Sequence, residues 1–157
     1  MVDVMANYDL LVDLNQVDFK VETEVAIKRV LSPDADEVVE FITAHFSKKW
    51  ASEAKAALYK PFSSCFIAVI DKKVVGFACY DATAKGFFGP IGVDETIRGK
   101  NIGKALLLKS LEGMKYEGYH YAIIGGVSDR VFTFYNKSCG AIKIENSAKI
   151  YLSMISK

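Results

Sequence analysis

A strand-like run, a turn rich in glycine and lysine, and an apolar helix follow one another in the second half of the chain. The strand is Gly86–Val93, the turn is Arg98–Lys104, and apolar residues then recur at helical spacing as far as Met114. A second strand-like run, Tyr119–Val127, follows Gly118. Two strands joined by a helix run parallel in one sheet, with a right-handed connection. The segment therefore requires an α/β sheet.

Further strand patterns extend this sheet with antiparallel neighbours. Two apolar runs flank a short polar turn as a hairpin does, and others alternate apolar with polar residues. These strands are predicted at Val25–Leu31, Cys65–Ile70, Val74–Tyr80, Ala141–Glu145 and Lys149–Ile155, with Leu10–Val12 and Val17–Val21 as candidates for extra strands.

Helices are predicted between these strands. Pro33–Phe46 has apolar residues at helical spacing, with Ser32 as the expected N-cap, and further helices are predicted over Trp50–Leu58 and Arg130–Ser138. The resulting fold class is α/β (α+β), with a mixed, mostly antiparallel central sheet flanked by helices.

The length and composition fit one domain. The chain has 157 residues, of which 51% are hydrophobic and 25% charged, without repeats or linker-like tracts. We predict a single domain over residues 1–157, with 1–24 as an N-terminal extension of uncertain structure and 25–157 as the core. A net charge of +1 excludes a general attraction to nucleic acid or an anionic membrane, so an anion site would have to be local.

Targeting and metal-binding patterns are missing from the sequence. No apolar run approaches the roughly 18 residues of a membrane span, and the first residues do not form a secretory signal, so we expect a cytoplasmic protein. Cys65, Cys79 and Cys139 have no Cys-x-x-Cys spacing, and His45 and His120 are the two histidines. We therefore expect reduced thiols and no metal site.

The turn Arg98–Lys104 has the properties of a phosphate-binding site. The first N–H groups of a helix lack intrahelical acceptors and carry the positive end of its dipole. Gly99 and Gly103 allow a close approach, and Arg98, Lys100 and Lys104 add positive charge. The spacing differs from the two best-known phosphate loops. Taken alone, the turn is also compatible with an ordinary helix start carrying solvated lysines.

The preceding strand favours the first interpretation. Gly89, Pro90 and Gly92 interrupt it, and Pro90 cannot donate to a sheet ladder, so a bulge is expected. A bulged strand can leave N–H groups unpaired toward a ligand. The N–H groups of Ile91 and Val93 are the candidates.

These residues resemble a family signature. The stretch Ile91-x-Val93, a spacer, then Arg98-Gly99-Lys100-Asn101-Ile102-Gly103-Lys104 and an apolar helix resembles the acetyl-CoA signature of the GNAT acetyltransferase superfamily. Phe134-Tyr135-Asn136-Lys137 resembles its second block. The order of elements from Val25 onward also matches the GNAT fold.

The resemblance implies an N-acetyltransferase with acetyl-CoA as co-substrate. The acetyl group would move to a primary amine of an unidentified small molecule or peptide by direct attack. By this resemblance, the pyrophosphate would be bound by the backbone amides of Lys100, Asn101, Ile102, Gly103 and Lys104. Arg98 and Gly99 would belong to the same binding site. The amides of Ile91 and Val93 would bind the pantetheine arm. The hydroxyl of Tyr135 would protonate the leaving thiolate.

Three departures from the family pattern matter. Asn101 replaces a usual glycine, but asparagine tolerates a left-handed backbone, so the turn is expected to survive. Ser128 replaces an asparagine that contacts the cofactor arm in many members, and a serine can still donate there. One extra residue lies between Tyr135 and Gly140.

The general base and the acceptor stay open. Asp94, Glu95, His45 and His120 are candidates for the base, each also explained by an ordinary structural or solvated role. Aromatic residues that either line an acceptor pocket or belong to the core are Trp50, Tyr59, Phe62 and Tyr80. A non-catalytic acyl-CoA-binding sensor or scaffold is the alternative function. The high hydrophobic fraction suggests a homodimer that pairs C-terminal strands.

Overall fold

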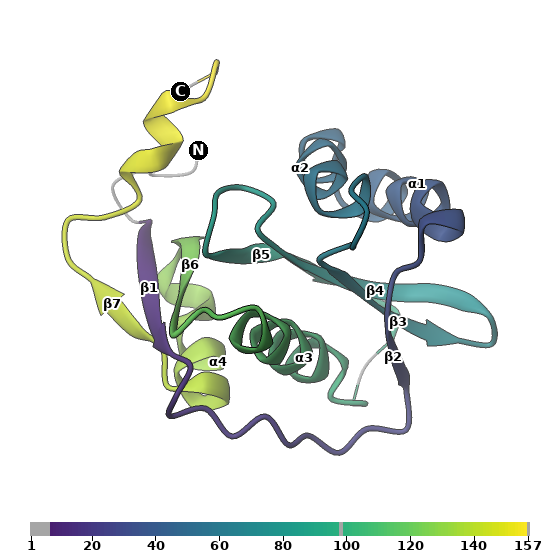
Figure 1. The fold of residues 1–157 in the computed structure, drawn as a ribbon, viewed down its shortest axis with the longest axis horizontal. Coiled ribbons are helices and arrows are strands. Elements are labelled where there is room, and N and C mark those ends of the chain that lie inside the picture. The colour runs from purple at the N-terminus through teal and green to yellow at the C-terminus, as the bar shows by residue number, and fades with distance from the viewer. Residues whose placement is uncertain (1–6, 98, 157) are drawn as a thin grey trace.

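A seven-stranded sheet organises the protein in the computed structural model, which describes residues 7–97 and 99–156 (Figure 1). The strand order is β2-β3-β4-β5-β6-β1-β7. The strands are β1 (Tyr8–Asp13), β2 (Ala26–Arg29), β3 (Cys65–Ile70), β4 (Lys73–Tyr80), β5 (Phe87–Val93), β6 (Tyr121–Val127) and β7 (Ile142–Ile144). The β5–β6 pair is parallel, and the other neighbours are antiparallel. The predicted mixed sheet is confirmed.

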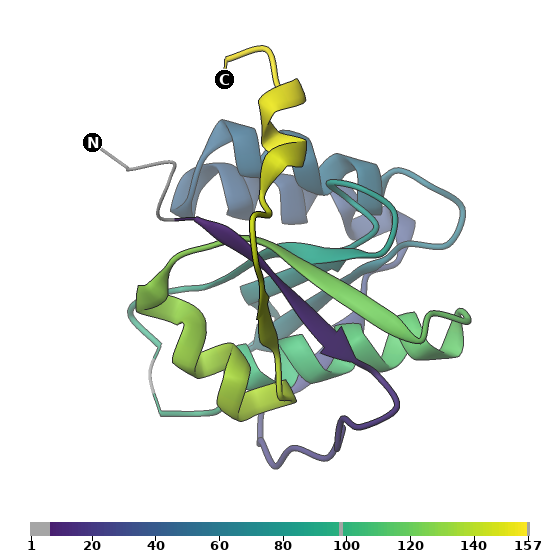
Figure 2. The same cartoon turned by 90° about the vertical axis from the view of Figure 1, so that its left-hand side faces the viewer.

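Two layers of helices cover the two faces of the sheet (Figures 1 and 2). Helices α1 (Ala35–His45) and α2 (Lys48–Leu58) lie on one face. Helices α3 (Ile102–Tyr116) and α4 (Asp129–Cys139) lie on the other. Each layer buries an apolar cluster against the strands. The sheet therefore separates the two helical layers, and a group that reaches from one to the other has to pass between strands.

The outer side of α3 is covered by the chain between β1 and β2. Val17, Phe19 and Val21 pack against the core there, and the Lys115 ammonium lies 5.7 Å from the centre of the Phe19 ring. The segment forms no strand, so the strand predicted at Val17–Val21 is wrong. Its alternating apolar side chains pack on a helix instead of pairing with a strand.

β1 lies between β6 and β7, which confirms the candidate strand at Leu10–Val12. The first strand of the chain is thus inserted between two strands that come from the C-terminal part of the sequence (Figure 2). β7 is the last strand in the sheet order, and the homodimer that pairs C-terminal strands stays a prediction.

The chain after β7 is not the predicted strand at Lys149–Ile155. It forms a 3-10 helix, η3 (Lys149–Ser153). Asn146 and Ala148 adopt left-handed φ angles of 56° and 65°, which turn the chain away from the sheet edge. The C-terminal segment then passes beside β5 and β6 toward the α1–α2 layer (Figure 2).

The predicted N-cap at Ser32 is also wrong. Ser32–Asp34 form a 3-10 turn, η2, in which the Asp34 N–H donates to the Leu31 carbonyl at 2.9 Å. The α-helix starts at Ala35, so its cap position moves to Asp34, and Ser32 makes no side-chain cap.

Candidate active site

β5 contains the bulge that the sequence predicts. Ala78 of β4 is opposite Ile91, whereas Tyr80 is opposite Phe88, so β5 has one extra residue in this interval. Gly89 lies within it at a φ of 118°, which strongly favours glycine.

β6 contains a second bulge at the same level of the sheet. Tyr8 of β1 is opposite Val127 and Leu10 is opposite Ile124, which leaves one extra residue in β6 around Gly125 and Gly126. The pairing between β5 and β6 is restricted to the register Phe87–Ile123 and Phe88–Ile124. The two strands diverge beyond this point, and the two bulges border the opening.

The N–H groups of Ile91 and Val93 point toward this opening. The Asp94 N–H donates to the Val75 carbonyl of β4 at 2.8 Å. Because successive N–H groups of a strand alternate in direction, those of Val93 and Ile91 point away from β4, on the side where β6 has diverged. This is the direction in which the sequence analysis placed them.

The turn before α3 is shaped by two left-handed residues. Gly99 has a φ of 72° and Asn101, the N-cap residue of α3, has a φ of 57°. The Asn101 side chain makes no cap hydrogen bond, so it does not occupy the first N–H groups of the helix. Arg98, the first predicted residue of this cradle, lies outside the described residues.

The same turn is fixed from its outer side. The Thr23 hydroxyl donates to the Lys100 carbonyl at 2.7 Å, and the Asn101 amide donates to the Glu22 carbonyl at 3.3 Å. Both bonds use atoms other than the N–H groups of Ile102, Gly103 and Lys104. The start of α3 is held in place by atoms other than these N–H groups.

The helix start meets the opening between the strands. A Cβ atom added at Gly103 would be 4.0 Å from Val93 and 3.8 Å from Phe134 of α4. The turn, the end of β5 and α4 therefore converge. Ser128, directly after β6, is the N-cap residue of α4 and makes no side-chain cap, so its hydroxyl is not committed to the helix start.

Tyr135 of α4 is buried, with 8% of its surface exposed. Its ring packs edge-on to Phe88 of β5 at 6.5 Å and to Phe134 at 5.1 Å. Burial, with a smaller effect from the nearby Cys139 thiol, raises the pKa of the Tyr135 hydroxyl to about 12. No side chain in the described part of the chain hydrogen-bonds to this hydroxyl, and with this raised pKa it is protonated at neutral pH.

Cys79 and Cys139 are buried free thiols. The Cys139 thiol donates to the Tyr135 carbonyl at 3.2 Å, and burial raises its pKa to about 11. Burial also raises the pKa of the Cys79 thiol. Both are neutral thiols at physiological pH, and a thiolate is the reactive form.

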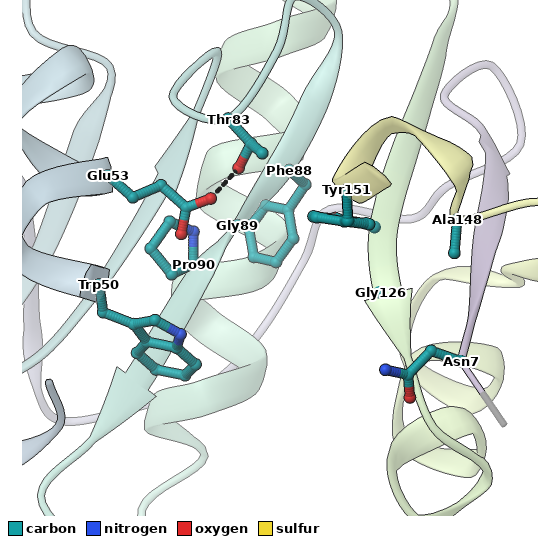
Figure 3. Close-up of a pocket in the computed structure, with 11 residues that line it drawn as sticks. Asn7, Trp50, Glu53, Thr83, Phe88, Gly89, Pro90, Gly126, Ala148 and Tyr151 are labelled. Carbon is teal, nitrogen blue, oxygen red and sulfur yellow. Dashed lines mark hydrogen bonds between the residues drawn. The ribbon is translucent and has the colours of Figure 1, made fainter. Parts of the chain in front are cut away.

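A cavity of about 250 Å³ opens between the two bulges, on the α1–α2 side of the sheet (Figure 3). Its described lining contains three aromatic residues, three glycines and one carboxylate. It is lined by Asn7, Trp50, Glu53, Thr83, Phe88, Gly89, Pro90, Gly125, Gly126, Ala148 and Tyr151.

Several residues of this cavity were missed by the sequence analysis, among them Glu53, Thr83 and Tyr151. Glu53 of α2 accepts a hydrogen bond from the Thr83 hydroxyl, as Figure 3 shows, and Tyr151 of η3 packs against Gly125 so closely that a side chain there would not fit. The spacing of Glu53, three residues after Trp50, places both on one side of α2 and was a usable signal. Tyr151 gave no such signal, because its segment resembled a strand.

The other aromatic candidates lie elsewhere. Trp50 lines the cavity, whereas the Tyr59 hydroxyl donates to Asp36 at 2.7 Å and Phe62 packs against the Arg29 guanidinium. Tyr80 is fully buried and donates to Glu117.

The four candidates for the general base, two acids and two histidines, lie away from the cavity. His45 Nε2 is 3.7 Å from an Asp94 carboxylate oxygen, and both line a separate hollow with Glu95 at the far end of β5. The His120 ring lies 3.3 Å from the Asn15 side chain at the start of β6.

Neither a metal centre nor a membrane span is apparent in the described ranges. Residues 7–97 and 99–156 contain no group of three or more His, Cys, Asp or Glu side chains placed to hold a metal ion. Over the same part of the chain, no helix combines the length and apolar character that crossing a membrane requires.

Solved structures with the same fold include acetyltransferases. A GCN5-related glucosamine N-acetyltransferase region in a fungal multi-domain GH3 β-N-acetylglucosaminidase superposes with a TM-score of 0.71 at 14% identity, covering 88% of this chain and 20% of that one. A GCN5-related N-acetyltransferase from Sphaerobacter thermophilus gives 0.69 at 19% identity, covering 88% and 48%. This chain thus spans less than two thirds of either protein.

A third structure holds a ligand. A GNAT family acetyltransferase from Brucella melitensis, solved with acetyl-CoA, gives a TM-score of 0.53 at 20% identity and covers 72% of this chain and 82% of that one. At these identities the likeness establishes the fold. No protein of curated function matches significantly.

A family model supplies the remaining evidence. The model of the acetyltransferase (GNAT) family matches residues 30–141, more than half of the chain. The match includes β5, the turn before α3, and α4. The chain belongs to the GNAT acetyltransferase family.

Proposed function

We propose that this protein is an N-acetyltransferase that transfers the acetyl group of acetyl-CoA to a primary amine by direct attack. The observation that carries the proposal is the divergence of β5 and β6. It turns the N–H groups of Ile91 and Val93 toward an opening that ends at the start of α3. A pantetheine arm carries amides that can pair with such N–H groups, and a pyrophosphate fits a helix start.

The residues have separate tasks in this proposal. Acetyl-CoA supplies an activated acyl group as a thioester. The backbone from Gly99 to Lys104, with Arg98, holds the pyrophosphate, and Val93 and Ser128 hold the pantetheine arm. The Ile91 N–H stabilises the negative charge that develops on the thioester carbonyl oxygen. Tyr135 donates a proton to the departing sulfur.

The alternative is a non-catalytic acyl-CoA-binding module. Such a module would use the same N–H groups and the same helix start. The cavity on the other side of the two bulges favours the enzyme, because it gives a second molecule access to the point where the strands part.

The first experiment tests binding of the donor. Coenzyme A is expected to raise the melting temperature of the protein, because a ligand that binds the folded state stabilises it, whereas ATP is not. A response to ATP equal to that to coenzyme A would contradict a site built for the pantetheine arm.

The second experiment tests Tyr135. Replacing Tyr135 with Phe removes the proton donor and keeps the ring, so kcat for acetyl transfer is expected to fall about 100-fold. The melting-temperature shift with coenzyme A is expected to stay. If wild type binds coenzyme A but acetylates no amine of a broad panel, the non-catalytic alternative is correct.

A further inference from the structure

We propose that Glu53 binds the acceptor ammonium group and takes its proton, and that the acceptor is a small primary amine with one positive charge and a flat apolar group. This inference rests on the proposed acetyl transfer. It concerns the cavity on the α1–α2 side of the sheet (Figure 3).

Glu53 is the single carboxylate among the described residues that line this cavity. It accepts a hydrogen bond from the Thr83 hydroxyl, which fixes one carboxylate oxygen. Figure 3 shows the carboxylate beside Pro90, at the bulge of β5. A positioned carboxylate beside aromatic rings in the wall of a cavity is suited to bind a cation.

The competing acids lie too far along the sheet. Pro90 of β5 borders the cavity, and Asp94 follows four residues later, directly after the end of the strand, a separation of about 13 Å at the usual rise of an extended chain. Asp94 is also close to His45 in a separate hollow. A proton on an amine in the cavity can pass directly to Glu53 and not to these groups.

Glu53 and Tyr135 together account for the two protons that the acceptor nitrogen loses. Glu53 takes the first proton from the ammonium and passes it to water. The nitrogen lone pair then forms the new bond to the acetyl carbon, and the carbon–sulfur bond breaks with its electron pair on sulfur. Tyr135 gives its proton to that sulfur and regains the second proton lost by nitrogen. The products are the amide, the free thiol and one proton released to solvent.

The aromatic residues that line the cavity determine which apolar group the acceptor amine can carry. Trp50 and Tyr151 contribute aromatic rings from opposite sides of the cavity, and Phe88 lies between them (Figure 3). Flat rings favour an apolar group of matching shape and also favour a cation close to their faces. Glu53 is the one carboxylate among the described lining residues of this cavity of about 250 Å³, and the nearby Asp9 carboxylate already accepts the Gly126 and Ala148 N–H groups. A second ammonium group in the cavity would therefore find no uncommitted carboxylate as a partner.

The acceptor experiment compares matched amines. For wild type, we expect kcat/KM for 2-phenylethylamine to exceed that for 1,4-diaminobutane by about 10-fold or more, because of the unpaired second charge. Replacing Trp50 with Leu is expected to lower kcat/KM for 2-phenylethylamine more than for n-propylamine. Equal use of 2-phenylethylamine and 1,4-diaminobutane by wild type would overturn the substrate class.

The Glu53 experiment uses an isosteric variant. Glu53→Gln is expected to lower kcat/KM for 2-phenylethylamine about 100-fold, and Glu53→Asp less. The loss is expected to be much smaller with 2,2-difluoro-2-phenylethylamine, since fluorine makes this amine less basic and it arrives deprotonated. The same loss on both amines would overturn the role in deprotonation.

Control measurements distinguish a failure of the role proposed for Glu53 from a failure of the proposed acetyl transfer. Glu40→Gln, on the exposed side of α1, is expected to behave as wild type. Glu53→Gln is expected to keep its melting-temperature shift with coenzyme A, which excludes misfolding. If wild type transfers acetyl groups and Glu53→Gln does so equally well, this inference fails alone. If wild type binds coenzyme A and transfers to no amine, the proposed function fails first.

Discussion

Asn101 illustrates how one residue fixes the donor side of the site. Its φ of 57° is in the left-handed region, where asparagine and glycine are tolerated and β-branched residues are not. Replacing Asn101 with Val is expected to lower the free energy of unfolding by about 1–2 kcal/mol. It is also expected to weaken coenzyme A binding, because relaxing the strain moves the first N–H groups of α3. Urea denaturation and calorimetric titration measure the two effects.

Asn101→Gly is the matched control for that prediction. Glycine accepts the same backbone angle and loses one exposed hydrogen bond to Glu22. Coenzyme A affinity close to wild type is expected. Equal losses for the Val and Gly variants would show that the side chain, and not the backbone angle, matters at this position.

Site residues differ in how far the sequence could predict them. Gly99, Asn101 and the N–H groups of Ile91 and Val93 belong to one continuous stretch, so local turn chemistry and strand alternation were enough to predict their backbone geometry. Glu53 looks in the sequence like a polar residue of an amphipathic helix. Its place at the cavity depends on how α2 packs over β5, which local patterns do not encode.

At the level of elements, Asp9 joins β1, β6 and the C-terminal segment. Its buried carboxylate accepts the Gly126 N–H at 3.0 Å and the Ala148 N–H at 3.1 Å. Asparagine offers one acceptor oxygen and turns an N–H₂ group toward the other donor. We expect Asp9→Asn to lower the free energy of unfolding by about 1–3 kcal/mol. Faster hydrogen exchange at Ala148 would locate the damage in the C-terminal segment.

Asp13→Asn is the control on the same strand. Its carboxylate accepts the Asn15 N–H at 2.9 Å in an exposed turn, where water can replace the lost bond. Its effect is expected to stay below about 1 kcal/mol. The role assigned to Asp9 is wrong if the two variants are equally destabilised.

Elements with regular patterns were predictable, and elements shaped by distant contacts were not. The hairpin of β3 and β4 and the helix α3 follow from apolar alternation and helical spacing. The segments Val17–Val21 and Lys149–Ile155 alternate as strands do, but one packs on α3 and the other turns at Ala148 toward Asp9. In both cases a tertiary contact replaced the strand pairing that the local pattern indicated.

Across the whole molecule, buried and partly buried tyrosines make folding sensitive to alkali. The pKa of Tyr8, Tyr80, Tyr119 and Tyr135 is raised from 10 to about 12, in each case first by burial. Their contribution is intact below pH 10, the value in the unfolded chain, and is lost as pH rises toward 12. The reason is that the unfolded chain releases these protons first. The midpoint of urea unfolding is therefore expected to fall steadily across this interval.

A variant makes that prediction specific. The Tyr119 hydroxyl donates to the Asp81 carboxylate at 2.9 Å. Tyr119→Phe removes this hydroxyl, so the variant has one titrating tyrosine fewer. The fall in midpoint per pH unit is expected to be shallower than in wild type. A midpoint that does not change between pH 10 and 12 would contradict the raised pKa values.

The position of β1 between β6 and β7 has a consequence for the order of folding. The strand–turn–helix–strand unit that holds the donor residues is continuous in sequence, whereas Tyr8 pairs with Val127 across most of the chain. Closing a long loop is slower than closing a short one. Tyr151, a wall of the acceptor cavity, belongs to the segment that β1 anchors through Asp9. A folding chain is therefore expected to form the strand–turn–helix–strand unit before Tyr151 reaches its place beside Gly125.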